Sequence, residues 1–172
     1  MDFFIRGVRA LSMACGVVAA AALIAAVLVV CQMVAFRYFL NLSTVWQTEF
    51  VTFAIVGATF VGCPYVLLTR GHVNVDLVPL YVGPKSRFAL AMFSAVAAFA
   101  FSVIVAFYSA EYFYEAWDEG WVTETVWALP LWIPILPMPI GMGLLALQYL
   151  ADIICLITGR EAPFGIQPEL QE

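Results

Sequence analysis

Charged side chains are scarce in this sequence. Only 11% of the 172 residues are charged, whereas 65% are hydrophobic and the mean hydropathy is +0.99. A soluble domain has about a quarter charged residues and about half apolar ones, so this composition excludes an ordinary soluble protein and indicates an integral membrane protein. With seven lysines and arginines against twelve aspartates and glutamates, the chain also has no basic run of the kind that binds nucleic acid.

Chemically reactive groups are also rare. His72 is the only histidine, which excludes a haem held by two histidines of this chain. No loop is long enough to fold as a soluble catalytic domain, and no GxxxxGK[ST] phosphate-binding loop is present. The cysteines lie in or at the ends of apolar runs without CxxC spacing, so we interpret them as buried apolar side chains; they are Cys15, Cys31, Cys63 and Cys155. We therefore predict no enzymatic activity and no bound cofactor or metal.

The sequence does contain four long apolar runs. About 20 helical residues, each rising 1.5 Å, cross the roughly 30 Å hydrocarbon core of a bilayer. We predict an all-α integral membrane protein with a single membrane domain, 1–172, whose four spans are approximately 11–36, 50–69, 88–110 and 137–158. The apolar part of a signal peptide has only about 7–15 residues, so we expect the first run to be retained as a span.

Prolines and helical periodicity refine these spans. Pro64 is expected to bend the second span because proline lacks an N–H donor. Several prolines precede the fourth span, so we expect its helix to begin near Pro137–Gly141 and to run through Asp152. The third helix is expected to continue beyond the membrane, because an aromatic stripe and an acidic stripe recur there at every fourth residue. The stripes are Phe113, Trp117 and Trp121, beside Glu111, Glu115 and Glu119.

Small residues recur at helical spacing within the spans. Such residues let two membrane helices approach closely, and they predict the faces through which this chain packs. They are the pairs Ala21/Ala25, Ala22/Ala26, Ala58/Gly62, Ala91/Ala95 and Ser94/Ala98, together with Gly57.

The basic residues predict the orientation. Six of the seven fall on one side of a four-span arrangement, namely Arg6, Arg9, Arg70, Lys85, Arg87 and Arg160. Only Arg37 falls on the other side, so the positive-inside rule places both termini and the 70–87 loop in the cytoplasm. This loop is too short to cross and is interrupted by prolines, and we expect it to form a short interfacial segment. The 37–48 loop and the acidic 111–125 loop then face outward.

The centres of the spans are uncharged. Gln32 and Gln148 are the only strongly polar side chains embedded in them, whereas transporters place ionisable or broken-helix sites near the bilayer midplane. This pattern predicts an accessory or scaffold subunit that packs against a larger membrane partner. Glu49 is interpreted first as an interfacial carboxylate. A salt bridge to Arg37 or to a partner is the second interpretation.

Other polar or aromatic positions near the span ends have simple interpretations. His72 is most simply a solvated interfacial histidine, and Trp132 is most simply a residue of the aromatic belt. Asp76 is expected to cap a short surface helix or to pair with Arg70. The acidic face at 111–124 is most simply a solvated surface, and a docking patch for an external protein is the alternative.

In their order and spacing, several motifs over about residues 10–160 resemble the small membrane subunit (the Q component, or DctQ-like family) of tripartite ATP-independent periplasmic (TRAP) transporters. The motifs are Arg37 followed by Trp46-x-x-Glu49, Gly57 in the second span, Arg70-Gly71-His72-x-x-x-Asp76, and Leu131-Trp132 followed by Pro139-x-Gly141. The resemblance implies that these residues serve architecture and subunit contact, and not catalysis.

The resemblance also implies a multi-pass protein of a bacterial inner membrane that belongs to a secondary transporter driven by a sodium or proton gradient. The expected partners are a large membrane subunit, a periplasmic binding protein that delivers an organic acid, and membrane lipids. The small subunit would enlarge the static scaffold beside which the transport domain moves. Two alternatives stay open at this point: a four-span membrane redox or enzyme subunit, and a membrane assembly factor.

Overall fold

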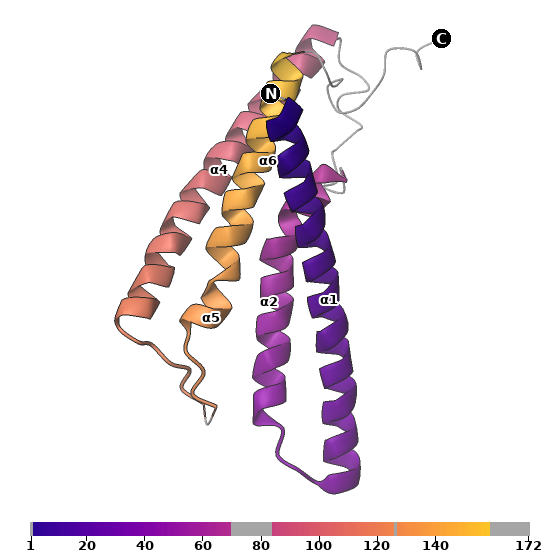
Figure 1. Ribbon diagram of the computed structural model, residues 1–172, viewed down its shortest axis with the longest axis vertical. Helices are drawn as coiled ribbons and strands as arrows, with labels where there is room; N and C mark the ends of the chain where they lie inside the picture. Colours follow the sequence, from indigo (N-terminus) through magenta and orange to yellow (C-terminus); the bar gives the residue numbers. More distant parts are fainter. Residues whose placement is uncertain (1, 70–83, 126, 159–172) are drawn as a thin grey trace.

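The computed structural model describes residues 2–69, 84–125 and 127–158, and these residues are mostly helical (Figure 1). The helices are α1 (Asp2–Leu40), α2 (Val45–Leu68), α4 (Pro84–Asp118), the single-turn α5 (Trp132–Ile135) and α6 (Pro137–Ile157). Four segments, α1, α2, α4 and α5 with α6, are long and apolar enough to cross a membrane. The predicted all-α architecture with four membrane-crossing helices is therefore confirmed.

The helices extend beyond the predicted spans. α1 has 39 residues, which is about 58 Å at 1.5 Å per residue and nearly twice the hydrocarbon thickness. The predicted spans stop at charged residues, but a helix does not, because its hydrogen bonds continue into the headgroup region. Residues 84–87, which we expected in the interfacial segment, form the first turn of α4. The rest of that expected segment, 70–83, lies outside the described residues.

The expected continuation of α4 is present, but it is shorter than the stripe pattern suggested. α4 ends at Asp118, and Gly120 takes a positive φ of 64° that breaks the helical path. Phe113 and Trp117 keep their place in the stripe, with ring centroids 6.3 Å apart. Trp121 does not belong to the stripe, because it lies beyond the end of the helix.

The long helices form a row in the order α4, α6, α2, α1 (Figure 1). α6 lies between α4 and α2, and it also contacts α1 near the end of the molecule where α1 begins. The α1–α2 turn and the α4–α5 connection both lie at the other end of the molecule, where the α1–α2 hairpin extends further (Figure 1). This arrangement leaves wide apolar faces uncovered: Ile24, Phe93 and Phe101 are 63%, 74% and 64% exposed.

Many of the side chains buried between neighbouring helices are small. Buried positions of α1 alternate at spacings of three and four residues, the pattern of left-handed helix pairs; they include Ile5, Val8, Ser12, Cys15, Ala19 and Ala26. The buried positions of α4 are Ala91, Ser102, Ser109 and Ala116. Of the predicted small-residue faces, Ala26, Ala58 and Ala91 are buried, whereas Ala21 and Ser94 are exposed.

Candidate functional site

The backbones of two helices approach each other closely at the crossing of α2 and α6. Gly141 is buried, and a Cβ atom added there would collide with the backbone carbonyl group of Phe60. A Cβ at Gly57 would lie 3.3 Å from Cγ of Pro137. The structure therefore brings these two predicted architectural glycines into one interface, in which the backbone of α6 rests directly on α2.

Pro64 changes the hydrogen bonding of α2 at the point where α6 touches Phe60. In an α-helix the N–H of residue i bonds to the carbonyl of residue i−4, and Pro64 has no N–H. The carbonyl of Phe60 therefore lacks its ordinary helical donor. Gly141 lies against this carbonyl, and only glycine lets a Cα–H group come so close. Pro64 is itself fully buried within α2.

A second link joins α6 to α1 through polar side chains. The Ser12 hydroxyl donates to Oε1 of Gln148 at 3.0 Å, and the Gln148 amide donates to Oδ1 of Asp152 at 3.2 Å. Ser12 and Gln148 are each 1% exposed. A hydrogen bond between membrane helices is favourable because the alternative is an unsatisfied polar group in hydrocarbon.

All five tryptophans gather at one end of the molecule, which we call the tryptophan end. They are Trp46, Trp117, Trp121, Trp127 and Trp132. The ring centroids of Trp46 and Trp127 are 6.4 Å apart, and those of Trp117 and Trp132 are 4.8 Å apart. The first contact ties the α4–α5 connection to α2, and the second ties α5 to α4. Such a cluster is typical of a membrane–water interface.

The α4–α5 connection has its own hydrogen bonds. The Leu131 N–H donates to the carbonyl of Trp121 at 2.8 Å, and the Thr123 N–H donates to that of Leu129 at 2.9 Å. The Trp121 ring lies 5.7 Å from the Tyr112 ring, and its N–H donates to the Glu119 carboxylate at 2.6 Å. The connection therefore presents a defined surface.

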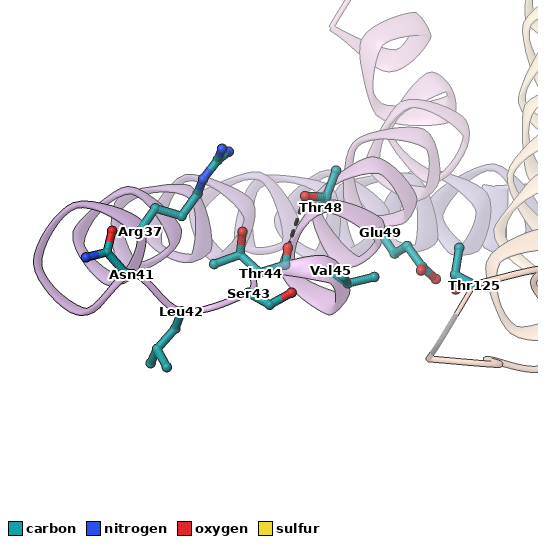
Figure 2. Close-up of a pocket in the computed structure, with 9 residues that line it drawn as sticks. All are labelled: Arg37, Asn41, Leu42, Ser43, Thr44, Val45, Thr48, Glu49 and Thr125. Atoms are coloured by element: carbon teal, nitrogen blue, oxygen red, sulfur yellow. Dashed lines mark hydrogen bonds between the residues drawn. The ribbon is translucent and has the colours of Figure 1, made fainter.

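An open cleft of about 690 Å³ lies at the tryptophan end, beside the turn between α1 and α2 (Figure 2). Its lining residues are Arg37, Asn41, Leu42, Ser43, Thr44, Val45, Thr48, Glu49 and Thr125. Both carboxylate oxygens of Glu49 are buried and have no hydrogen-bond partner within the part of the chain that the structure describes. Figure 2 shows the Glu49 side chain directed toward Thr125, while the Arg37 side chain points away from it. The salt bridge to Arg37, which was one form of the second interpretation of Glu49, is therefore not formed in this arrangement.

The remaining predicted positions are of two kinds. Trp132 and Pro139 are both half-buried; Trp132 packs on Trp117, and Pro139 lies in the first turn of α6. The motif Arg70, Gly71, His72 and Asp76 lies outside the described residues, and its roles stay predictions.

Sequence reasoning missed several contacts that the structure reveals. Phe60 gives no signal except its position four residues before Pro64. Trp127 belongs to a short connection, and nothing in its local pattern predicts the contact with Trp46. Gln148 was recognisable as a polar side chain in an apolar run, but its partner Ser12 is 136 positions away in the sequence.

The features found among the described residues are helix–helix contacts and a surface cleft. Across 2–69, 84–125 and 127–158, no group of three or more histidines, cysteines, aspartates or glutamates is placed to hold a metal ion. The features that stand out are the α2–α6 crossing, the Ser12–Gln148 link and the unpaired Glu49 carboxylate in the cleft.

Comparison with known proteins gives one family and one relative. Residues 26–159 match the family described as tripartite ATP-independent periplasmic transporters, DctQ component. The C4-dicarboxylate TRAP transporter small permease protein DctQ of Vibrio cholerae serotype O1 is 26% identical over 145 residues, which cover 72% of this chain and 62% of that protein. The match thus spans less than two thirds of that relative. No solved structure matches the chain significantly.

Proposed function

The chain belongs to the DctQ-component family of tripartite ATP-independent periplasmic transporters, and on this premise we propose that it is a scaffold subunit that packs against a large membrane subunit. Family membership makes the chain a transporter component and not an enzyme, and its four apolar segments make it a multi-pass membrane protein. We further propose that it resides in a bacterial inner membrane and serves ion-gradient-driven uptake of an organic acid delivered by a periplasmic binding protein.

The polar groups inside the spans support a scaffold role. Ser102 and Ser109 donate to carbonyl oxygens of their own helix, at 2.8 and 3.0 Å. Ser12 and Gln148 bond to each other. These buried groups are occupied inside the chain, so they offer little to a polar solute crossing the membrane. The wide apolar faces of the helix row are suited instead to lipid and to another membrane protein.

The test of this proposal is deletion of the chain from cells that retain the large subunit and the binding protein. We expect uptake of the organic acid to fall to the background level, because the scaffold of the large subunit is incomplete. The affinity of the binding protein for the acid should be unchanged. The measurements are uptake of radiolabelled substrate and calorimetry on the isolated binding protein.

Two other results of the deletion would contradict the proposal. Full uptake without the chain would show that the chain is not a required subunit of the transporter. A second result would favour the assembly-factor alternative. In that result less of the large subunit reaches the membrane, but each large subunit that is inserted transports at the normal rate. A bound chromophore or a redox activity of the chain alone would favour the enzyme alternative.

The orientation is a separate proposal, in which the tryptophan end faces the periplasm. It is supported by the basic residues, since Arg6 and Arg9 lie in the first turns of α1, at the end opposite the tryptophan end. Ser43 and Ser86 are exposed serines near the two ends. In a background in which all cysteines are replaced, we expect Ser43→Cys to react with an impermeant maleimide in intact spheroplasts and Ser86→Cys to react only after lysis. The reverse pattern would overturn the orientation.

A further inference from the structure

The least explained group in the described chain is the Glu49 carboxylate. Both oxygens are inaccessible to water and neither accepts a hydrogen bond. A buried charge without donors is strongly unfavourable, and native structures pair such charges or bind them to ions. A missing donor is therefore expected at this position.

Three of the polar side chains that line the cleft are paired elsewhere or turned away from Glu49. The Thr48 hydroxyl donates to the carbonyl of Thr44 at 3.3 Å, as Figure 2 shows. The Thr125 hydroxyl is paired with that of Thr123 at 3.2 Å. Arg37 borders the same cleft, but its guanidinium points away from Glu49. It is the one basic residue placed at the tryptophan end in the described ranges, because the others fall near the opposite end.

The surroundings of Glu49 indicate what supplies the donor. Glu49 lies in the second turn of the membrane helix α2, and the cleft beside it is open. Its neighbours Val45 and Trp46 are apolar side chains that are 43% and 42% exposed, whereas the lining of the cleft is mostly polar. The exposed apolar side chains fit another membrane protein, and the polar lining fits a polar side chain of that protein. Two oxygens that both lack donors match the two parallel N–H groups of a guanidinium.

We propose that an arginine side chain of the large membrane subunit enters the cleft at the tryptophan end and pairs with Glu49. This inference rests on the proposed function, since it names one contact of the same assembly. The pair forms at the edge of the membrane, where removal of water strengthens it. In the isolated chain the Glu49 carboxylate has no partner among the described residues, and in the complex it forms a salt bridge with the arginine.

The proposal predicts that substitutions of Glu49 weaken binding to the large subunit without destabilising the isolated chain. Glu49→Gln and Glu49→Leu should leave the thermal midpoint of the isolated chain in detergent unchanged or raise it by about 2–4 °C, because an unsatisfied buried charge is removed. The same variants should bind the large subunit about 30-fold more weakly, because an arginine would then be left without its partner. Glu115→Gln is the matched control: Glu115 is an exposed carboxylate of α4 near the same end, and both quantities should stay as in the wild type.

The readouts are thermal unfolding of the purified chain and the affinity for the purified large subunit in nanodiscs. A charge-swapped pair, Glu49→Arg with glutamate in place of the responsible arginine, should restore binding. Wild-type affinity of Glu49→Gln, or a lower midpoint of the isolated variant, would overturn the inference. So would a defect that affects only capture of the binding protein. If the wild-type chain itself fails to bind the large subunit, the proposed function fails instead, so the two failures are distinguishable.

Discussion

Gly141→Leu is expected to separate α6 from α2 and to abolish assembly of the transporter. The Cβ of any residue other than glycine meets the Phe60 carbonyl group, which belongs to the backbone and cannot rotate away. Alanine at this position gains about 1 kcal/mol of helix propensity, yet overpacking of a tight contact costs about 1–3 kcal/mol. For Gly141→Ala we therefore expect a net loss, and for leucine a loss large enough to displace the helix.

Gly143 provides the matched control, two residues further along the same helix. A Cβ at Gly143 has no neighbour within 4 Å, so Gly143→Ala should be neutral or stabilising through the same gain of about 1 kcal/mol in helix propensity. The measurement is thermal unfolding of the purified variants, in which each 1 kcal/mol corresponds to about 2–4 °C for a chain of this size. Equal behaviour of the two alanine variants would show that the α2–α6 contact does not depend on glycine.

Gly57 lies in the same interface but should be more tolerant. Its added Cβ would meet the ring of Pro137 at 3.3 Å, and a ring edge can yield by a few tenths of an ångström where a backbone carbonyl cannot. We therefore expect alanine at Gly57 to lower the stability of the chain less than alanine at Gly141, because the added Cβ meets a proline ring at Gly57 and a backbone carbonyl at Gly141.

Much of this fold follows from local sequence properties. Long uncharged runs predict membrane helices because the cost of burying a charge applies to every residue in the hydrocarbon core. The start of the fourth long helix at Pro137 follows from the tolerance of a first helical turn for proline. The ends of α1 and α4 could not be predicted in this way, because beyond the core a charge no longer opposes a helix. The end of α4 depends on Gly120, whose positive φ becomes visible only in the structure.

The candidate contacts are harder to predict because they join distant parts of the chain. Gly57 was recognisable as a close-packing residue and Gly141 as an architectural candidate, but their surroundings follow from the order of the helices in the row. For Glu49 the sequence left open an interfacial carboxylate or a salt bridge to Arg37 or a partner. The two residues do border one cleft, and the orientation of their side chains decides against an internal pair. Glu49 is directed toward Thr125 of the α4–α5 connection, which the sequence pattern did not place beside α2.

Gln148→Ala is expected to loosen α6 from α1 at the end opposite the tryptophan end. The substitution removes the acceptor of the Ser12 hydroxyl and the donor to Asp152, and it leaves a cavity where a side chain only 1% exposed had been. Lost buried hydrogen bonds and the cavity together cost about 2–4 kcal/mol. The expected result is a fall in the thermal midpoint of the purified chain and lower uptake in cells.

Gln32→Ala is the control for this prediction, because Gln32 is the other glutamine embedded in a span and its side chain is exposed. It should change the midpoint little. The double variant Ser12→Ala with Gln148→Ala tests the bond itself: because the two side chains bond to each other, the two single losses should exceed the loss of the double variant by about 1 kcal/mol. Strict additivity would mean that the packing of Gln148, and not its hydrogen bond to Ser12, holds α1 against α6. The cycle thus separates the polar link from the small-residue contacts that surround it, and it decides which of the two keeps the first helix in the row.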